Sequence, residues 1–185
     1  GTMPRTDGMQ LAMPGSSILG FDKSHVYSSW DLLGFGKITQ LRGPAVVFDD
    51  TGSFEAISVC DVLLAKGLPV TLVSRHNAIG ESLPYPPVTA GAARERLYGG
   101  DFDFIGGHYL QQIDDDKVDI GVLFTDRRRS IAAQTVVFVG YNEPNRSLWQ
   151  SLQGNGPTAH MIGDVRGRNS IMSAIHAGAE LGRSI

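Results

Sequence analysis

The residues best placed to do chemistry in this sequence lie where short apolar segments end. Ala45–Phe48 is a continuous apolar segment, and Asp49–Ser53 follows it as a tight turn before a helical pattern. A turn that binds a dinucleotide in this position needs the pattern G-x-G-x-x-G, because glycines let backbone amides approach the pyrophosphate. Aligned on the start of the helical pattern, the three glycine positions hold Phe48, Asp50 and Ser53. The turn therefore lies where a dinucleotide-binding turn is expected, but it lacks the three glycines of the motif.

Two interpretations of this turn stay open. In the first, Asp50, Thr51 and Gly52 face a nucleotide, although a carboxylate at about 4 Å repels a phosphate charge by about 1 to 4 kcal/mol. In the second, Asp50 or Thr51 accepts hydrogen bonds from the first amides of the helix, which stabilises a helix by about 1 kcal/mol. The second is favoured, so we expect this domain to have lost nicotinamide-dinucleotide binding and to serve as a scaffold.

A second polar pair follows the next apolar segment. Ser74 and Arg75 come directly after Val70–Val73. An acidic residue at this point favours NAD, whereas Ser74 and Arg75 could hold the 2′-phosphate of NADP. The alternative is an arginine on the surface without a ligand, and it is favoured because the preceding turn lacks its glycines.

Composition and charge exclude several classes of function. The net charge of −3 and the single basic cluster, Arg127–Arg129, give no electrostatic footprint for nucleic acid. No apolar run reaches the roughly 20 residues that span a bilayer, and the start of the chain lacks the apolar core of a signal peptide. We therefore expect no nucleic-acid or membrane partner and a cytoplasmic protein. A first residue that is Gly1 rather than methionine suggests a truncated or tagged chain.

The spacing of the reactive side chains predicts neither a metal site nor a catalytic nucleophile. The five histidines and the acidic run Asp114–Asp116 lack the spacing of zinc or calcium ligands. Cys60 is the single cysteine, which excludes a disulfide within the chain, and its apolar helical neighbours favour a small buried hydrophobe over a nucleophile. No catalytic residue is therefore expected in this chain.

The spacing of apolar residues predicts a strand–helix–strand unit that positions both polar groups. Ala45–Phe48 and Val70–Val73 are expected to be parallel strands buried on both faces. Between them, Phe54–Lys66 has helical periodicity, with Gly67 as a C-terminal cap. Two parallel strands joined in this way form a βαβ unit with a right-handed crossover.

The rest of the chain predicts further elements around this unit. Asp114–Lys117 is expected to be a hairpin turn within a meander of short strands. The other expected strands are 103–105, 109–113, 118–124, 135–139 and His160–Ile162, and the other expected helices are Ser28–Leu33, Thr89–Tyr98, Ser147–Leu152 and Ile171–Leu181. The predicted fold class is α/β, a Rossmann-like three-layer NAD(P)-type domain with a β-meander, flanked by partial FAD/ADP-type segments.

Four segments in this order resemble the NADH:flavin oxidoreductases, a family that includes trimethylamine dehydrogenase, histamine dehydrogenase and 2,4-dienoyl-CoA reductase. Thr2–Gly8 resembles the segment just after the Ala-Thr-Gly motif that closes the first half of the outer nucleotide domain. Val26–Leu33, with its Ser-Ser-Trp-Asp core, resembles the linker that follows, and Ala45–His76 resembles the opening of the inserted domain. Gly163–Ile185 resembles the returning tail of the outer domain, and the likeness is closer to the two amine dehydrogenases.

The resemblance implies a domain organisation and a division of chemistry. Residues 1–44 would be a segment of the outer FAD/ADP-type domain with its linker, 45–140 the inserted Rossmann-like domain, and 141–185 the returning outer segment. In the intact enzyme, FMN and a [4Fe–4S] centre would lie in an upstream barrel of the same polypeptide, and an electron-transfer flavoprotein could accept the electrons. The outer domain would hold an ADP or FAD/NAD(P)-type nucleotide.

Gly163 and Asp164 carry the part of that nucleotide site which the resemblance places in this chain. In the family's second flavin motif, an aspartate at this point accepts hydroxyl groups of the nucleotide, and a Pro-Arg pair follows it. The matching pair here is Arg168-Asn169, which departs from the motif. A helix-capping aspartate is the alternative for Asp164.

The leading hypothesis is thus a nucleotide-domain portion of a flavin-dependent oxidoreductase, an amine dehydrogenase or enoate reductase type, without catalysis in this chain. One rival is a stand-alone, non-catalytic nucleotide-binding or interaction module. Another is an NADPH-binding domain that delivers hydride despite the altered turn. An exposed sheet edge left by missing outer strands would also favour a homo-oligomer.

Overall fold

The computed structural model describes residues 1–35, 40–154, 158–167 and 170–184. These residues form two compact units. The larger unit is Arg5–Tyr141, and the smaller combines Gly1–Pro4 with Asn142–Ile185.

The larger unit is built on a five-stranded parallel sheet in the order β2-β9-β3-β4-β5. The strands are β2 (Val26–Ser28), β9 (Thr135–Val139), β3 (Ala45–Asp49), β4 (Val70–Ser74) and β5 (Phe102–Ile105). All residues of β3 and β9 are buried, as their continuous apolar sequence predicts for strands covered on both faces. The central strand β3 therefore lies between β9 and β4.

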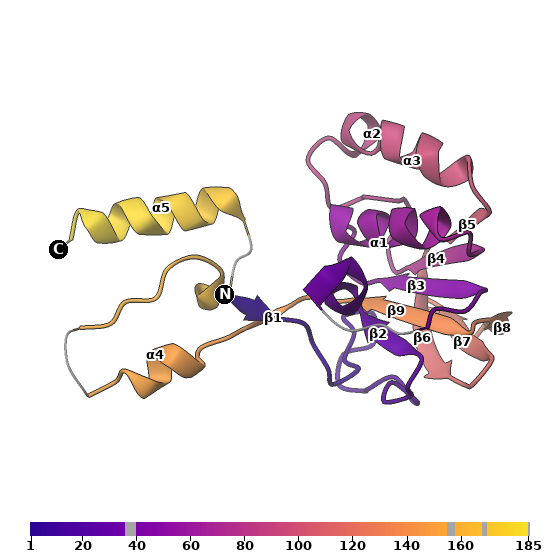
Figure 1. The fold of residues 1–185 in the computed structure, drawn as a ribbon, viewed down its shortest axis with the longest axis horizontal. Helices are drawn as coiled ribbons and strands as arrows, with labels where there is room; N and C mark the ends of the chain where they lie inside the picture. The colour runs from indigo at the N-terminus through magenta and orange to yellow at the C-terminus, as the bar shows by residue number, and fades with distance from the viewer. Residues whose placement is uncertain (36–39, 155–157, 168–169, 185) are drawn as a thin grey trace. The chain divides into compact units, whose positions relative to one another are not determined.

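Alternate residues of β3 point into two separate apolar clusters. Ala45 and Val47 pack against α1 (Phe54–Ala65) and α3 (Gly91–Tyr98), which follows the short helix α2 (Pro86–Thr89). Val46 and Phe48 pack on the opposite face against the antiparallel sheet β6-β7-β8. Figure 1 shows these layers, with helices on one side of the parallel sheet and the meander on the other. The predicted βαβ unit and three-layer arrangement are confirmed.

The meander contains one strand that the sequence pattern did not predict. It consists of β6 (His108–Ile113), β7 (Lys117–Val122) and β8 (Arg128–Ala132). The predicted turn between the first two is present, since the Asp114 amide donates to the Lys117 carbonyl at 2.8 Å. β8 was missed because four of its five residues are exposed and polar residues begin it, so its identity as a strand comes from pairing with β7.

The predicted helix Ser28–Leu33 is present, but it begins one residue later than predicted. Val26–Ser28 pairs in parallel with Val136–Phe138 of β9 and forms the edge strand β2. The chain turns only after Ser28, whose hydroxyl and amide both donate to the Asp31 carboxylate at 2.7 and 2.9 Å. A short helical segment, Asp31–Phe35, then follows. Pairing with a buried neighbour therefore decides the conformation of Ser28, the one residue of the predicted helix that lies in a strand.

The smaller unit has little core of its own. Its strands β1 (Thr2–Met3) and β10 (Glu143–Pro144) pair antiparallel, and its helices are α4 (Ser147–Ser151) and α5 (Ile171–Gly182). Neither helix has a buried residue, and Ile171 and Met172 of α5 are each 82% exposed. The predicted strand His160–Ile162 is wrong, because these residues pair with no strand in the described part of the chain.

Among the described residues, no helix combines the length and the apolar character that crossing a bilayer requires.

The packing of α1 on the sheet gives a stability prediction. Leu63 of α1 is fully buried in the cluster between helices and sheet. Leu63→Ala should lower the free energy of unfolding by about 2 to 5 kcal/mol, since both apolar burial and packing are lost. The matched change Leu19→Ala, at a side chain 61% exposed, should stay within about 0.5 kcal/mol of the wild type. Urea denaturation followed by circular dichroism measures both, and equal losses would contradict the assignment of the core.

Candidate functional site

The carboxyl ends of β3 and β4 bring the two predicted polar groups together. Asp49 at the end of β3 is the register partner of Ser74 at the end of β4. The Ser74 hydroxyl donates to the Asp49 carbonyl at 3.0 Å, and Arg75 lies directly after it. In open α/β sheets ligands bind outside this edge. The site residues predicted in this unit are therefore neighbours in space.

The carboxylate of Asp49 fills the turn that follows β3. It accepts hydrogen bonds from the backbone amides of Thr51 at 2.9 Å and Gly52 at 2.8 Å, and from the Thr51 hydroxyl at 3.0 Å. These amides occupy the turn in which a Rossmann fold presents its amides to a pyrophosphate. Because Asp49 is only 1% exposed, an incoming anion meets a buried anion that already holds the donors. The residues present do not fit a pyrophosphate here.

The helix cap lies at a different residue from the one predicted. The prediction that Asp50 or Thr51 caps α1 is wrong, because Ser53 does so with its hydroxyl, which accepts from the Glu55 amide at 3.3 Å. Ser53 has the extended backbone that a capping residue adopts, with φ −106° and ψ 179°. Thr51 instead shares a hydrogen bond with the Ser53 hydroxyl at 2.8 Å. The side chains of Asp49 and Asp50, which precede Thr51, do not cap the helix.

Asp50 ties three parts of the unit together. Its carboxylate accepts from the Leu11 amide at 2.7 Å and lies 3.1 Å from Arg75 Nε, which also donates to the Asp50 carbonyl at 2.7 Å. Asp50 is 1% exposed. Arg75, predicted as a ligand for a 2′-phosphate or as a free surface residue, is thus paired within the protein. A segment 39 residues earlier in the chain is fixed over the sheet edge.

Burial governs the protonation of both aspartates. The pKa of Asp49 is raised because burial disfavours its charged form, although the Gly52 and Thr51 hydrogen bonds oppose the shift. The pKa of Asp50 is also raised by burial, against the opposing Leu11 amide and the Arg75 charge. Cys60 is buried as predicted, and burial raises the pKa of its thiol well above the ordinary value.

Gly52 and His76 form a close contact that the sequence did not reveal. Gly52 has a φ of +67°, and a Cβ added there would lie 2.9 Å from His76 Nε2 and 2.7 Å from Ser82 Oγ. Only glycine fits this backbone and this space. His76 Nε2 is buried and has no hydrogen-bond partner within the described ranges. Gly52 therefore allows close packing against His76 and Ser82. The G-x-G-x-x-G pattern describes glycines that admit a phosphate, so it could not reveal this contact.

A pocket of about 530 Å³ opens beside this network, at the ends of β4 and β5. It is lined by Leu11, Arg75, Asn77, Gly107, Leu123 and Phe124, among others. Sequence reasoning found only Arg75 among them, because the rest come from loops far apart in the chain. This cavity is lined by one of the predicted site residues, Arg75.

The predicted nucleotide residues of the smaller unit lie in a short turn. Gly163, with φ +71°, begins a 3-10 turn that ends at Arg166, and the Asp164 carbonyl accepts from the Gly167 amide at 3.0 Å. Asp164 is half-buried. The other half of the predicted contact, Arg168-Asn169, lies outside the described residues. A nucleotide role for Gly163 and Asp164 stays a prediction.

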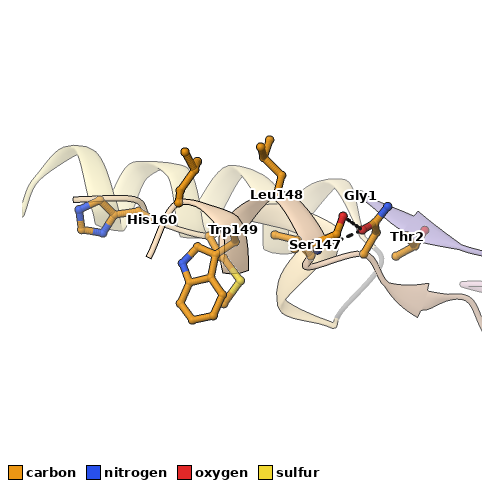
Figure 2. A pocket seen from close by; sticks show the side chains of 10 residues that line it. Gly1, Thr2, Ser147, Leu148, Trp149 and His160 are labelled. Atoms are coloured by element: carbon orange, nitrogen blue, oxygen red, sulfur yellow. Dashed lines mark hydrogen bonds between the residues drawn. The ribbon is translucent and has the colours of Figure 1, made fainter. Parts of the chain in front are cut away.

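A separate pocket of about 380 Å³ lies in the smaller unit. Figure 2 shows Gly1, Thr2, Ser147, Leu148, Trp149 and His160 around it. The Trp149 ring donates through Nε1 to the Ala159 carbonyl at 3.4 Å, while Leu148 extends in the opposite direction from α4 and is 71% exposed. Gly163 and Asp164 do not line this pocket. Within the described ranges, no group of three or more His, Cys, Asp or Glu side chains could hold a metal ion.

The sheet order, the helices on one face and the meander on the other define a Rossmann-like α/β domain of the type found in FAD- and NAD(P)-binding oxidoreductases, which confirms the predicted fold class. The sequence matches no family model and no curated protein.

Solved structures carry the comparison further. The chain is similar to histamine dehydrogenase from Rhizobium sp. 4-9, with a TM-score of 0.85 and 21% identity over 100% of this chain. It is similar to 6-hydroxypseudooxynicotine amine oxidase from Pseudomonas geniculata N1, with a TM-score of 0.83 and 23% identity over 98% of this chain. 2-Naphthoyl-CoA reductase gives 0.75 and 23% over 92%. The chain spans 29%, 27% and 25% of these three proteins, respectively. At these identities the similarity establishes a shared fold.

The buried carboxyl of Asp50 gives a prediction of pH dependence. Because its pKa is raised on folding, the folded state binds this proton more tightly than the unfolded state. The stability of the wild type relative to Asp50→Asn should therefore fall as pH rises from the ordinary carboxyl pKa to the raised one, by at most about 1.4 kcal/mol per pH unit. Above that window the difference should be constant.

Urea denaturation of both proteins across this pH range measures the difference. Asp126→Asn, at an exposed carboxyl of the turn before β8, is the matched control and should show no such slope. A wild-type advantage that grows with pH would mean that Arg75 outweighs burial at Asp50, contrary to the assignment.

Proposed function

We propose that this chain is the nucleotide-domain portion of a flavin-dependent oxidoreductase with the architecture of histamine dehydrogenase and 6-hydroxypseudooxynicotine amine oxidase. The support is a fold shared over 98 to 100% of the chain, which spans 27 to 29% of those proteins. On this proposal residues 45–140 are the inserted domain, and 1–44 and 141–185 belong to the outer nucleotide domain and its linker.

The role that we propose for the inserted domain is structural. The observation that carries this proposal is the contact of the Asp49 carboxylate with the Thr51 and Gly52 amides. Those donors are the means by which a Rossmann turn binds a pyrophosphate, and here they are satisfied internally. A domain that keeps the fold while its ligand turn is closed can position neighbouring parts of an enzyme, but it cannot hold a dinucleotide for hydride transfer.

The chemistry of the intact protein belongs, on this proposal, to parts outside the chain. FMN and a [4Fe–4S] centre would lie in a barrel domain of the same polypeptide, and an electron-transfer flavoprotein would accept the electrons in the cytoplasm. The outer domain would hold an ADP-type nucleotide structurally, with Gly163 and Asp164 as this chain's contribution. A second copy of the chain is a further proposed partner.

The contacts of Ser74 and Arg75 speak against the NADPH alternative. Ser74 donates to the Asp49 carbonyl, and Arg75 Nε is held by Asp50. Binding a 2′-phosphate at Ser74 and Arg75 would have to compete with these internal partners. The stand-alone interaction module explains the closed turn equally well, and it differs from the leading proposal in what precedes Gly1.

A titration tests the structural role. Isothermal calorimetry of the chain with NADH and with NADPH should show no saturable binding in the micromolar range, because the turn has no free amides to offer. The variant Asp49→Asn serves as the control for charge, since the amide keeps an acceptor in the turn while removing the negative charge. Micromolar binding of either dinucleotide by the wild type would overturn the structural role.

The coding sequence distinguishes the leading proposal from the stand-alone module. The reading frame upstream of the Gly1 codon should continue into a barrel domain followed by a cysteine cluster for the iron–sulfur centre. The protein expressed from that longer frame should carry the absorbance of bound flavin. A stop codon directly upstream, or a longer protein free of flavin after reconstitution, would favour the stand-alone module.

A further inference from the structure

The outer edge of the meander is the strand β8, and this edge is open to pairing. β8 is the last strand of the sheet β6-β7-β8, and four of its five residues are exposed. The opposite edge is covered, because the Ile113 amide of β6 donates to the Leu19 carbonyl at 2.8 Å. Among the described residues, no strand pairs with the outer side of β8 (Figure 1). An open edge of this kind is a template on which another chain can add a strand.

The hydrogen bonds to β7 show which backbone groups of β8 point outward. The Val122 amide donates to the Arg127 carbonyl at 2.9 Å, and the Ala133 amide donates to the Asp116 carbonyl at 2.8 Å. In an antiparallel ladder, every second residue of a strand bonds to the same neighbour. Residues 127, 129, 131 and 133 therefore bond to β7, and residues 128, 130 and 132 direct their amides and carbonyls away from it.

Unpaired charges of opposite sign lie at the two ends of the β7-β8 hairpin. Arg127–Arg129, at the end where β8 begins, are all exposed and form no ion pair within the described part of the chain. Asp116, at the end where β7 begins, is also exposed and has no ion pair there. Charge alone would keep most partners off this edge, since edge arginines repel a strand that presents arginines of its own.

One register of two β8 strands brings these opposite charges together. In this register β8 pairs antiparallel with β8 of a second copy, and Ser130 lies on the two-fold axis. Residue 127 of one copy is then opposite Ala133 of the second copy, and Asp116 of the second copy follows in the same row and on the same face. The Cα atoms of Arg127 and Asp116 are about 10 Å apart across two strand spacings, which both side chains together span. Ala133 is small enough for Arg127 to pass over it.

Neighbouring registers are less favourable. With residue 129 on the axis, Arg129 would lie directly opposite Arg129 of the second copy. With residue 131 on the axis, residue 128 would have to pair with Gln134, whose amide already donates to the Pro44 carbonyl at 2.8 Å. The register centred on Ser130 uses the outward groups of residues 128, 130 and 132 and requires no others.

Two like-charge contacts oppose this register, and neither is close. Arg129 of each copy lies diagonally across the axis from the other, with the Cα atoms about 7 to 8 Å apart, and both side chains are exposed to screening by water and salt. Arg128 lies in one row with Lys117 of the second copy, two strands away. The Lys117 ammonium group is already paired with the Asp114 carboxylate at 3.4 Å.

We propose that the outer edge of β8 binds a second copy of this chain, with the two β8 strands antiparallel about Ser130 and with Arg127 of each copy paired to Asp116 of the other. This goes beyond the function proposed above, which leaves the surface used by a second copy open, and it does not rest on it. Titration with NADH and the upstream reading frame test that function, whereas association between copies tests this one.

Charge-reversal variants test the pairing of Arg127 with Asp116. In sedimentation equilibrium the wild type should dimerise with a Kd of about 10 to 100 μM, since one strand pair buries less area than a standard interface. Arg127→Glu and Asp116→Arg should each weaken the dimer at least about tenfold, because each change acts twice in a two-fold assembly. The double variant, which restores opposite charges, should return to within about threefold of the wild type.

The double variant reports contact between copies, because Arg127 and Asp116 of one chain lie at opposite ends of the hairpin. Lys66→Glu makes the same change of charge at an exposed residue after α1, so it is the matched control and should stay within about twofold of the wild type. A monomeric wild type, a dimer that both single variants leave intact, or a double variant without recovery would each overturn the proposal.

A pair of cysteine substitutions tests the position of the axis. Two Ser130→Cys chains would have Cα atoms about 5.5 Å apart, which suits a disulfide, whereas residues 128 of the two copies are about 14 Å apart. Mild oxidation should therefore convert Ser130→Cys into a covalent dimer on a non-reducing gel and leave Arg128→Cys monomeric. Cys60 is buried and should not contribute. Equal cross-linking of the two variants would exclude this register and overturn the proposal.

Discussion

The carboxylate of Asp49 is the constraint on which the ligand edge of this domain depends. Successive backbone amides in a turn after a strand form a concave site for an anion. In this chain the anion is a side chain of the same turn, bound by the Thr51 and Gly52 amides and by the Thr51 hydroxyl. A tethered anion competes with a free ligand at an effective concentration in the millimolar range or above. Burial raises the pKa of Asp49, so the folded chain bears a desolvation cost that the three hydrogen bonds only partly offset.

Asp50 extends this internal network across the rest of the edge. A single buried carboxylate contacts the Leu11 amide on one side and Arg75 on the other. Removing either partner would leave buried charge unpaired, which costs more than the pair itself contributes. The segment before the sheet and the residue after β4 are consequently fixed together. The edge at which Rossmann-like domains bind a ligand is here linked by hydrogen bonds within the protein.

The local sequence pattern predicted the central strands because a continuous run of apolar residues indicates a strand buried on both faces. Val46, Val47 and their neighbours are apolar on both faces, so β3 follows from sequence alone. Arg128–Ala132 is exposed, and only its pairing with β7 makes it a strand. The polar residues of the site were predicted from their positions directly after strands. The residues that they contact were not predicted. The contact between Asp50 and Leu11 joins residues 39 positions apart, and the pocket at the ends of β4 and β5 is lined by residues from four separate segments of the chain. No periodicity within one segment carries that information.

The two units differ in how completely they bury their own apolar side chains. In the larger unit both faces of the parallel sheet are covered, and fully buried side chains such as Phe48, Leu63 and Leu72 fill two clusters. In the smaller unit α5 exposes Ile171, Met172 and Ile175 at 82%, 82% and 66%. Ile171 and Ile175 are four residues apart and so lie on one face of the helix, and grouped exposed apolar side chains are typical of an interaction face. The three proteins compared above are about four times as long, since the chain spans 25 to 29% of them. The larger unit therefore has the interior of an autonomous domain, whereas the smaller one has the surface of a part made to be covered, as the proposed outer nucleotide domain requires.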